Sequence, residues 1–373
     1  MKISRTMVRL VAVVTAIAIA IVVVQRLVPS RAPGGPATAP DRRATGAEGV
    51  LLPEVQGIAA WINSQPLTVA ALRGKVVLVD FWTYSCVNCL RTLPYLKEWH
   101  AKYASRGLVI LGVHTPEFHF EKDAANVRAA VAKHGVTWPV ALDNDYATWE
   151  AYGNRYWPHK YLGDSRGVRR YDHIGEGAYS ETERWIRQLL TEAGGDVSDI
   201  PTGARDVEEA DGGPITRELY AGSAWVFGFY IGNPAPDRQG SIGAYTDSGE
   251  RRNGKLYLQG RWEQSEEYVR LDGTRPDAAA YVAIGYRASG VNVVARAEAP
   301  SPLLVEVTLD GKPVTPDAAG DDLALTPDGR TVFSVNEARL YSVVRAASVG
   351  DHELRLTPAS AGFALYTFTF SAY

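Results

Sequence analysis

The hydrophobic positions follow two different rhythms along the chain. Over 51–193, short apolar runs alternate with stretches in which apolar residues recur every three or four positions. The runs at 75–80 and 108–113 are nearly all apolar, which predicts strands covered on both faces of a sheet. Between them, the recurrence over 89–106 predicts a helix. The order of these elements predicts an α/β fold, with a mixed central sheet flanked by helices. Further helices are predicted over 121–134, 146–152 and 181–192, and further strands over 138–142, 160–162 and 168–171.

The pattern becomes all-β after a stretch rich in Gly, Asp, Glu and Pro, 194–214. Short strand-like runs are separated there by turn signals such as Asp310-Gly311 and Asp328-Gly329. Roughly eight such runs predict an antiparallel sandwich of jelly-roll type. They are 256–258, 281–286, 291–295, 304–309, 332–335, 340–344, 354–356 and 363–370.

The N-terminus carries a third pattern. Lys2, Arg5 and Arg9 precede an uncharged run over 10–24. With its flanks, 8–28, the run has about the twenty residues that a membrane span requires. We expect an uncleaved single transmembrane helix, and a cleaved signal peptide is the alternative. In both cases the rest of the chain is expected on the extracytoplasmic, oxidising side.

These patterns predict five segments in the 373 residues. They are a membrane anchor over 1–28, a flexible linker over 29–50, an α/β domain over 51–195, a second linker over 196–215 and a β-sandwich over 216–373. Two folded domains fit a chain of this length. The formal net charge is only −3, so nothing points to a basic stripe that would bind nucleic acid.

The chain has two cysteines, Cys86 and Cys89, which directly follow the first apolar run of the α/β segment. A cross-link over two intervening residues would constrain the unfolded chain very little. A zinc site would normally need two more ligands at recognisable spacing. We therefore expect a redox-active disulfide, Cys86–Cys89, with no metal and no other cofactor. A helix N-terminus favours a thiolate, so Cys86 is predicted to be the nucleophile and Cys89 the resolving thiol.

The residues around this pair resemble a known family. Val79-Asp80-Phe81-Trp82 before Cys86, and Pro94 after Cys89, resemble the thioredoxin fold. Cys-Val-Asn-Cys-Leu-Arg resembles its extracytoplasmic TlpA/ResA branch. The run 81–96 looks most like the periplasmic part of DipZ-type proteins, as do His114-Thr115-Pro116-Glu117-Phe118, Tyr156-Trp157-Pro158 and Gly175-Glu176-Gly177. The following β-domain resembles, through weaker motifs, the carbohydrate-binding-like module attached to DipZ-type domains.

The resemblance implies roles for two further residues. Pro158 matches a cis-proline that faces the dithiol, where the neighbouring backbone pairs with a substrate strand; an ordinary turn proline is the alternative. Asp80 matches a buried acid that assists proton transfer at the resolving thiol, with a pKa raised by burial. The alternative for Asp80 is an aspartate that caps a loop at the end of a strand.

Other side chains are weaker candidates. The substrate groove is expected to include Trp82, Glu117, Trp157 and His159, although core packing explains Trp82 equally well and a surface loop explains Glu117. Arg91 is expected to be a solvated helix residue. The histidines form no ligand-spaced pair on one helix, which argues against a metal site. In the β-domain, the aromatic residues Trp225, Tyr230, Trp262 and Tyr268 are expected in the core, with a sugar-stacking platform as the alternative.

These observations favour an extracytoplasmic, membrane-anchored thiol–disulfide oxidoreductase that reduces or exchanges disulfides in exported proteins. DipZ-type proteins carry an electron-passing membrane domain with several spans, whereas this sequence predicts at most one membrane helix. We therefore expect a separate CcdA/DsbD-like membrane protein to donate electrons here. One alternative is a cell-surface module in which the β-sandwich binds carbohydrate or a protein partner. Another is a thiol peroxidase, although such enzymes use a distant resolving cysteine.

Overall fold

The computed structural model describes residues 49–203, 213–224, 230–233, 242–273, 280–298 and 302–372. The predicted membrane anchor and almost all of the first linker lie outside these residues. No helix within the described ranges is long and apolar enough to span a bilayer. Residues Gly49–Tyr373 form one compact unit, in which a region with a mixed sheet precedes a region made of antiparallel strands.

The first region is built on a six-stranded sheet with the order β1-β4-β3-β2-β5-β6. Its strands are β1 (Ala60–Ile62), β2 (Val76–Trp82), β3 (Leu108–His114), β4 (Val140–Leu142), β5 (His159–Gly163) and β6 (Arg169–Ile174). β2 runs parallel to β3 and antiparallel to β5, and every residue of β2 is buried. A strand buried on both faces is what a nearly all-apolar run predicts, so the mixed central sheet is confirmed.

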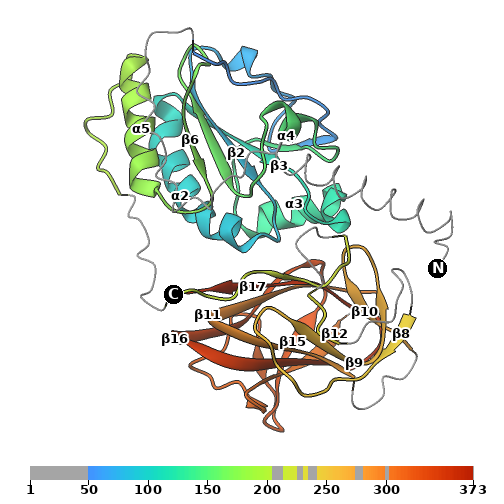
Figure 1. The fold of residues 1–373 in the computed structure, drawn as a ribbon. Coiled ribbons are helices and arrows are strands. Elements are labelled where there is room, and N and C mark those ends of the chain that lie inside the picture. Colours follow the sequence, from blue (N-terminus) through green and yellow to red (C-terminus); the bar gives the residue numbers. More distant parts are fainter. Residues whose placement is uncertain are drawn as a thin grey trace, which may run out of the picture. The chain divides into compact units, whose positions relative to one another are not determined.

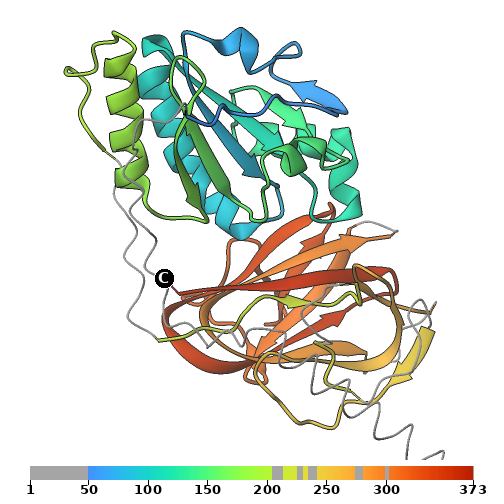
Figure 2. The same ribbon diagram turned by 45° about the horizontal axis from the view of Figure 1, so that its top comes forward.

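Helices cover both faces of this sheet. They are α2 (Val87–Tyr103), α3 (Ala124–Lys133), α4 (Ala147–Ala151) and α5 (Tyr179–Glu192), with short 3-10 helices at Ala70–Leu72, Ala104–Arg106 and His119–Lys122. Alternate residues of β2 point to opposite faces. Leu78 and Trp82 pack with α2, α3 and α5, whereas Val79 and Phe81 pack against Trp149 of α4. Figure 1 and Figure 2 show α2 and α5 on one side of the central strands and α4 on the other.

In the second region, the described residues form one eleven-stranded antiparallel sheet. Its strands are β7 (Leu219–Tyr220), β8 (Ile242–Tyr245), β9 (Leu256–Gln264), β10 (Val269–Leu271), β11 (Tyr281–Ala297), β12 (Leu303–Leu309), β13 (Lys312–Pro313), β14 (Ala324–Leu325), β15 (Thr331–Val335), β16 (Arg339–Pro358) and β17 (Phe363–Ser371). The all-β class is confirmed, whereas the jelly-roll connectivity stays a prediction.

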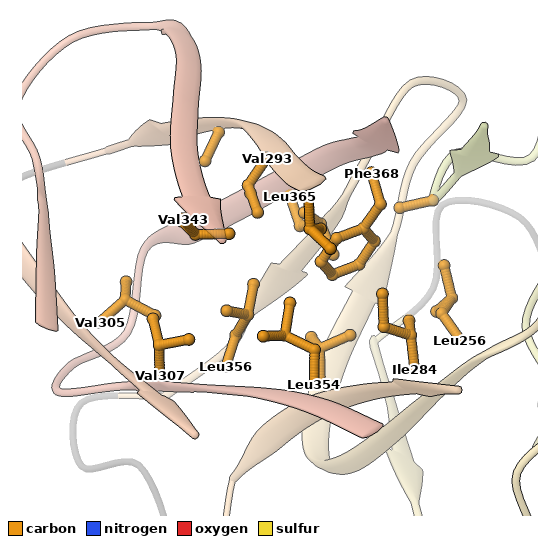
Figure 3. Packing of buried hydrophobic residues seen from close by; sticks show 14 of the residues in the cluster. Leu256, Ile284, Val293, Val305, Val307, Val343, Leu354, Leu356, Leu365 and Phe368 are labelled. Atoms are coloured by element: carbon orange, nitrogen blue, oxygen red, sulfur yellow. The ribbon is translucent and has the colours of Figure 1, made fainter. Parts of the chain in front are cut away.

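Two of these strands are longer than the sequence pattern predicted. The runs 281–286 and 291–295 belong to the single strand β11, whose register shifts between Ala288 and Gly290. The runs 340–344 and 354–356 likewise belong to β16. Each long strand contributes to two facing layers of the core: in Figure 3, Val293 and Val343 point toward Ile284 and Leu354. Prediction of separate strands was wrong because a bulge bends a strand without ending it.

An aromatic contact joins the two regions. The ring of Tyr366 on β17 lies 5.1 Å from the ring of Phe118 and 4.8 Å from that of Phe120, centroid to centroid. Both phenylalanines belong to the segment that follows β3. The edge-to-face geometry is the arrangement that aromatic pairs prefer. The β-region therefore packs on the segment after β3. Glu121 of the same segment binds Ser85, which precedes Cys86.

We predict that Tyr366→Ala lowers the free energy of unfolding by about 3 kcal/mol, because a side chain that is 1% exposed would leave a cavity. Urea unfolding of the full chain measures the effect. Leu325→Ala is the matched control, since Leu325 is 64% exposed and should change stability by less than about 0.5 kcal/mol. Equal effects of the two substitutions would contradict the packing described here.

Candidate redox site

The two cysteines lie where β2 passes into α2. Cys86 is the N-cap of α2, and its Sγ accepts a hydrogen bond from the backbone N–H of Cys89 at 3.3 Å. Both cysteines are free thiols in this structure. The N–H groups of the first helical turn lack partners inside the helix, so they stabilise a negative charge on the cap residue. The cap position therefore places backbone N–H groups of the first helical turn beside the Cys86 sulfur.

The two sulfurs differ in burial. Cys86 is partly exposed, whereas Cys89 is 1% exposed and packs in the core beneath α2. Burial raises the pKa of the Cys89 thiol well above its ordinary value, and the hydrogen bond and charge of Cys86 raise it further. The partly exposed Cys86 sulfur is accessible to a partner molecule. The buried, protonated Cys89 thiol must lose its proton to a base before it can react. The roles of nucleophile for Cys86 and resolving thiol for Cys89 stay predictions, and the two sulfurs differ in exposure as described.

Asp80 lies inside β2 and is 2% exposed. Burial raises its pKa to about 7, although the charge of Lys160 acts in the opposite direction. Its Oδ1 atom is buried and has no hydrogen-bond partner among the residues that the structure describes. Asp80 also contributes to the electrostatics of Cys89. A carboxyl group of this kind can exchange a proton near neutral pH.

The Trp157-Pro158 peptide bond is cis, as the sequence predicts. Pro158 is buried, and its carbonyl oxygen accepts the N–H of Gly175 at 2.7 Å. The indole Nε1 of Trp157 donates to the carbonyl oxygen of Thr115 at 3.0 Å. Trp157 and Cys86 both pack, partly buried, against the same hydrophobic cluster. The proline segment is thus fixed to the loop that follows β3.

Two of the groove candidates lie in the interior. Trp82 is 1% exposed and packs edge-on against the ring of His114, with 5.4 Å between centroids. His159 is also buried: its Nδ1 lies 2.7 Å from Asn154 Oδ1 and its Nε2 lies 3.1 Å from Asp172 Oδ2. With both ring nitrogens engaged, His159 orders the start of β5.

Glu117 lies at the contact with the β-region. Its Oε1 accepts a hydrogen bond from the hydroxyl of Tyr220 at 2.6 Å, and Glu218 accepts from the same hydroxyl at 3.0 Å. Burial raises the pKa of Glu117 well above its ordinary value, and the nearby Glu218 and Glu121 raise it further. One phenolic hydrogen cannot serve two carboxylates at once, so this arrangement favours a protonated carboxyl.

Sequence reasoning missed Glu121, which ties the cysteine loop to the segment after β3. Its Oε1 accepts the hydroxyl of Ser85 at 2.5 Å, and its Oε2 accepts the backbone N–H of Glu117 at 2.5 Å and of Phe118 at 3.0 Å. Ser85 immediately precedes Cys86. The apolar periodicity predicted one helix from Glu121, whereas Glu121 lies in the 3-10 helix His119–Lys122 and the helix α3 begins at Ala124. No spacing pattern marks such a long-range contact.

Arg91 lies on α2, and its side chain is 26% exposed. Its Nη2 donates to Asn88 Oδ1 at 2.6 Å and to Glu176 Oε1 at 2.6 Å. Asn88 stands between the two cysteines, so Arg91 connects the dithiol turn to the loop after β6. The signal that could have identified this pairing is the Gly175-Glu176-Gly177 motif, which presents an acid on a tight turn.

The remaining candidates do not gather at the cysteines. Trp262 is a buried core residue whose indole donates to Gln259 O, so it cannot serve a sugar-stacking platform; Trp225 lies outside the described residues. Among the scattered histidines, His114 is buried, and its Nε2 lies 3.3 Å from Thr83 Oγ1. Within the described ranges, no group of three or more Cys, His, Asp or Glu residues could hold a metal ion.

Comparison with known proteins identifies both regions. The Redoxin family matches residues 47–171, and the family described as thioredoxin like C-terminal domain matches residues 216–371. "Protein DipZ" of Mycobacterium bovis (strain ATCC BAA-935 / AF2122/97) is 38% identical over 272 residues, which are 72% of this chain and 38% of DipZ. The chain thus spans less than half the length of this relative.

Two shorter relatives match the first region. "Thiol-disulfide oxidoreductase YkuV" of Bacillus subtilis (strain 168) is 29% identical over 141 residues, 38% of this chain and 95% of YkuV. "Thiol-disulfide oxidoreductase ResA" of Bacillus thuringiensis (strain Al Hakam) is 27% identical over 128 residues, 34% of this chain and 71% of ResA.

We predict that Asp80→Asn changes the stability of the reduced protein more favourably at pH 8 than at pH 5. The Asp80 carboxyl ionises near pH 4 in the unfolded chain but near pH 7 in the folded one. Between these values the folded state binds more protons, so ionisation of Asp80 lowers stability as pH rises. Urea unfolding of the full chain at both pH values measures the difference.

Asp145→Asn is the control, because Asp145 is exposed and its substitution should give no pH-dependent change. A gain for Asp80→Asn that is equal at the two pH values would show that the buried charge is not its cause.

Proposed function

Since the chain belongs to the TlpA/ResA-like thioredoxin-fold family and has a DipZ-like C-terminal part, we propose that it is a thiol–disulfide oxidoreductase that reduces or exchanges disulfides in exported proteins. The observation that carries the proposal is the asymmetry of the cysteine pair. Cys86 is partly exposed at the helix N-terminus, and its Sγ lies 3.3 Å from the backbone nitrogen of the buried Cys89.

The reaction has two exchange steps. In the first, the Cys86 thiolate attacks one sulfur of the substrate disulfide, a mixed disulfide forms, and one substrate sulfur leaves as a thiolate. In the second, Cys89 loses its proton and attacks Cys86 Sγ. This step forms the Cys86–Cys89 disulfide and releases the second substrate sulfur. Two electrons have then passed from the dithiol to the substrate.

The surroundings of Pro158 support a protein substrate. Tyr156 is 53% exposed and Ile174 is 51% exposed, and both are among the few large hydrophobic side chains that the described residues present to solvent. Ile174 pairs with His159 across β5 and β6, next to the cis-proline. Exposed apolar side chains beside the cis-proline favour binding of an unfolded or extended polypeptide.

The location and the electron source belong to the same proposal. The basic cluster and apolar run of the N-terminus support a single membrane anchor with the dithiol on the extracytoplasmic side. In an oxidising compartment a dithiol needs a specific reductant, and we assign this task to a membrane electron donor of the CcdA/DsbD-like kind.

We predict that Cys89→Ala, in the full chain, accumulates mixed disulfides with exported proteins through Cys86. The substitution removes the attacking group of the second step and leaves the first step intact. Non-reducing electrophoresis of the captured species, followed by reduction, measures the trapping. Cys86→Ala is the matched control and should trap nothing.

The opposite pattern, or no trapping by either variant together with no reduction of insulin by the unmodified chain, would contradict the proposal. Two further measurements address the alternative functions. Rapid consumption of hydrogen peroxide would favour a peroxidase, and glycan binding that survives loss of both cysteines would favour a carbohydrate-binding module.

A further inference from the structure

A buried lysine lies on the same face of the sheet as Asp80. This face is the one that α2, which contains Cys89, covers. In the antiparallel register of β2 and β5, Lys160 is directly opposite Asp80. Directly opposed residues place their side chains on the same face, about 5 Å apart at Cβ. Leu78 and Trp82, two positions either side of Asp80, belong to the hydrophobic cluster that contains Cys89. Asp80 and Lys160 therefore point into the region beneath α2.

Lys160 is completely buried, with an exposed fraction of 0%. Its Nζ donates to the carbonyl oxygen of Gly175 at 2.8 Å and lies 5.9 Å from the ring centroid of Tyr179. A buried ammonium group is costly unless a negative charge compensates it, and a carbonyl oxygen supplies only a partial charge. An apolar residue would fit the pattern of this strand better, so the lysine calls for an explanation.

Several groups face Lys160 from the elements around it. Asp80 faces it from β2, Cys89 from α2 and Glu176 from the loop after β6, and each favours the charged form of the lysine. His173 lies opposite Lys160 on β6, where the lysine disfavours the imidazolium form. Glu176 is already paired with Arg91. Asp80 is thus the carboxyl group available to compensate Lys160, and its Oδ1 has no hydrogen-bond partner among the described residues.

We propose that Lys160 is a positioning residue for the second exchange step: its ammonium group holds Asp80 in the ionised form that accepts the Cys89 proton. This inference rests on the proposed oxidoreductase function. In the step, the Cys89 S–H proton passes to the Asp80 carboxylate, and the Cys89 sulfur attacks Cys86 Sγ of the mixed disulfide. The Cys86–Cys89 bond forms, the bond from Cys86 to the substrate sulfur breaks, and the substrate leaves as a thiolate.

Lys160 keeps its own proton throughout this step. Before the transfer, the Lys160 ammonium is the counter-ion of the Asp80 carboxylate. After the transfer, its positive charge favours the loss of the proton that Asp80 has accepted. Without the lysine, the carboxyl would be buried in an apolar core and would stay protonated to higher pH. Asp80 could then accept a proton only under more alkaline conditions, and the second step would slow at neutral pH.

A chromogenic aromatic disulfide, dithiobis-nitrobenzoate, resolves the two steps in the full chain. Attack by Cys86 releases one thionitrobenzoate at a rate that depends on reagent concentration. Attack by Cys89 on the resulting mixed disulfide releases the second at a rate that does not. The absorbance of thionitrobenzoate therefore gives the rate of each step, and the pH dependence of the second rate reports the group that accepts the Cys89 proton.

We predict that Lys160→Met slows the second release about tenfold at pH 7 and moves the midpoint of its pH profile upward by about one unit or more. The first release should stay unchanged within about twofold, because Cys86 does not depend on Asp80. Lys160→Arg, which keeps the positive charge, should retain the original midpoint. Lys133→Met removes an exposed lysine and is the matched control.

A double variant tests whether Lys160 acts through Asp80. Asp80→Asn removes the proton acceptor, so adding Lys160→Met to it should slow the second release no further, whereas independent effects would multiply. If Lys160→Met does not fold, Lys160→Gln replaces it with the same expectations, since its amide is neutral and can still donate a hydrogen bond.

An unchanged midpoint in the neutral variants, or multiplying effects in the double variant, would overturn the role of Lys160 and leave the oxidoreductase proposal intact. Failure of Cys89→Ala to trap any protein would instead overturn the proposed function, even if the aromatic disulfide releases both thionitrobenzoates in two phases.

Discussion

Burial of β2 is the constraint on which the site depends. All seven residues of Val76–Trp82 are buried, with β3 on one side and β5 on the other. A strand held in this way cannot shift its register without exposing its apolar side chains. It therefore fixes three things at once: the turn that carries Cys86 at the start of α2, the burial of Asp80, and the position of Lys160 opposite Asp80.

The same burial creates the electrostatic conditions of the site. Ionisable groups in an apolar core keep a charge only if a partner compensates it, and their pKa values move when none does. Cys89 is held protonated, Asp80 is brought into the neutral range, and Lys160 is the opposing charge. These shifts lower stability but place a carboxyl group that can exchange a proton near neutral pH close to Cys89.

The segment after β3 links the cysteine turn to the β-region. Glu121 binds Ser85 beside Cys86, while Phe118 and Phe120 of the same segment pack on Tyr366 of β17. The hydroxyl of Tyr220 reaches Glu117 from the β-region as well. A residue in the second half of the chain can therefore influence the loop that carries Cys86, although both cysteines lie in the first half.

The amino-acid sequence by itself determined the order of strands and helices around the dithiol and the cis bond before Pro158, because each depends on a local pattern or a compact motif. It did not identify Glu121, Lys160 or the ion pair of Arg91, because the interacting residues lie 36 to 85 positions apart along the chain. It also divided β11 and β16 where bulges bend them. Only the tertiary structure decided these features, since strand register and loop packing bring distant charges together and no spacing along the chain encodes them.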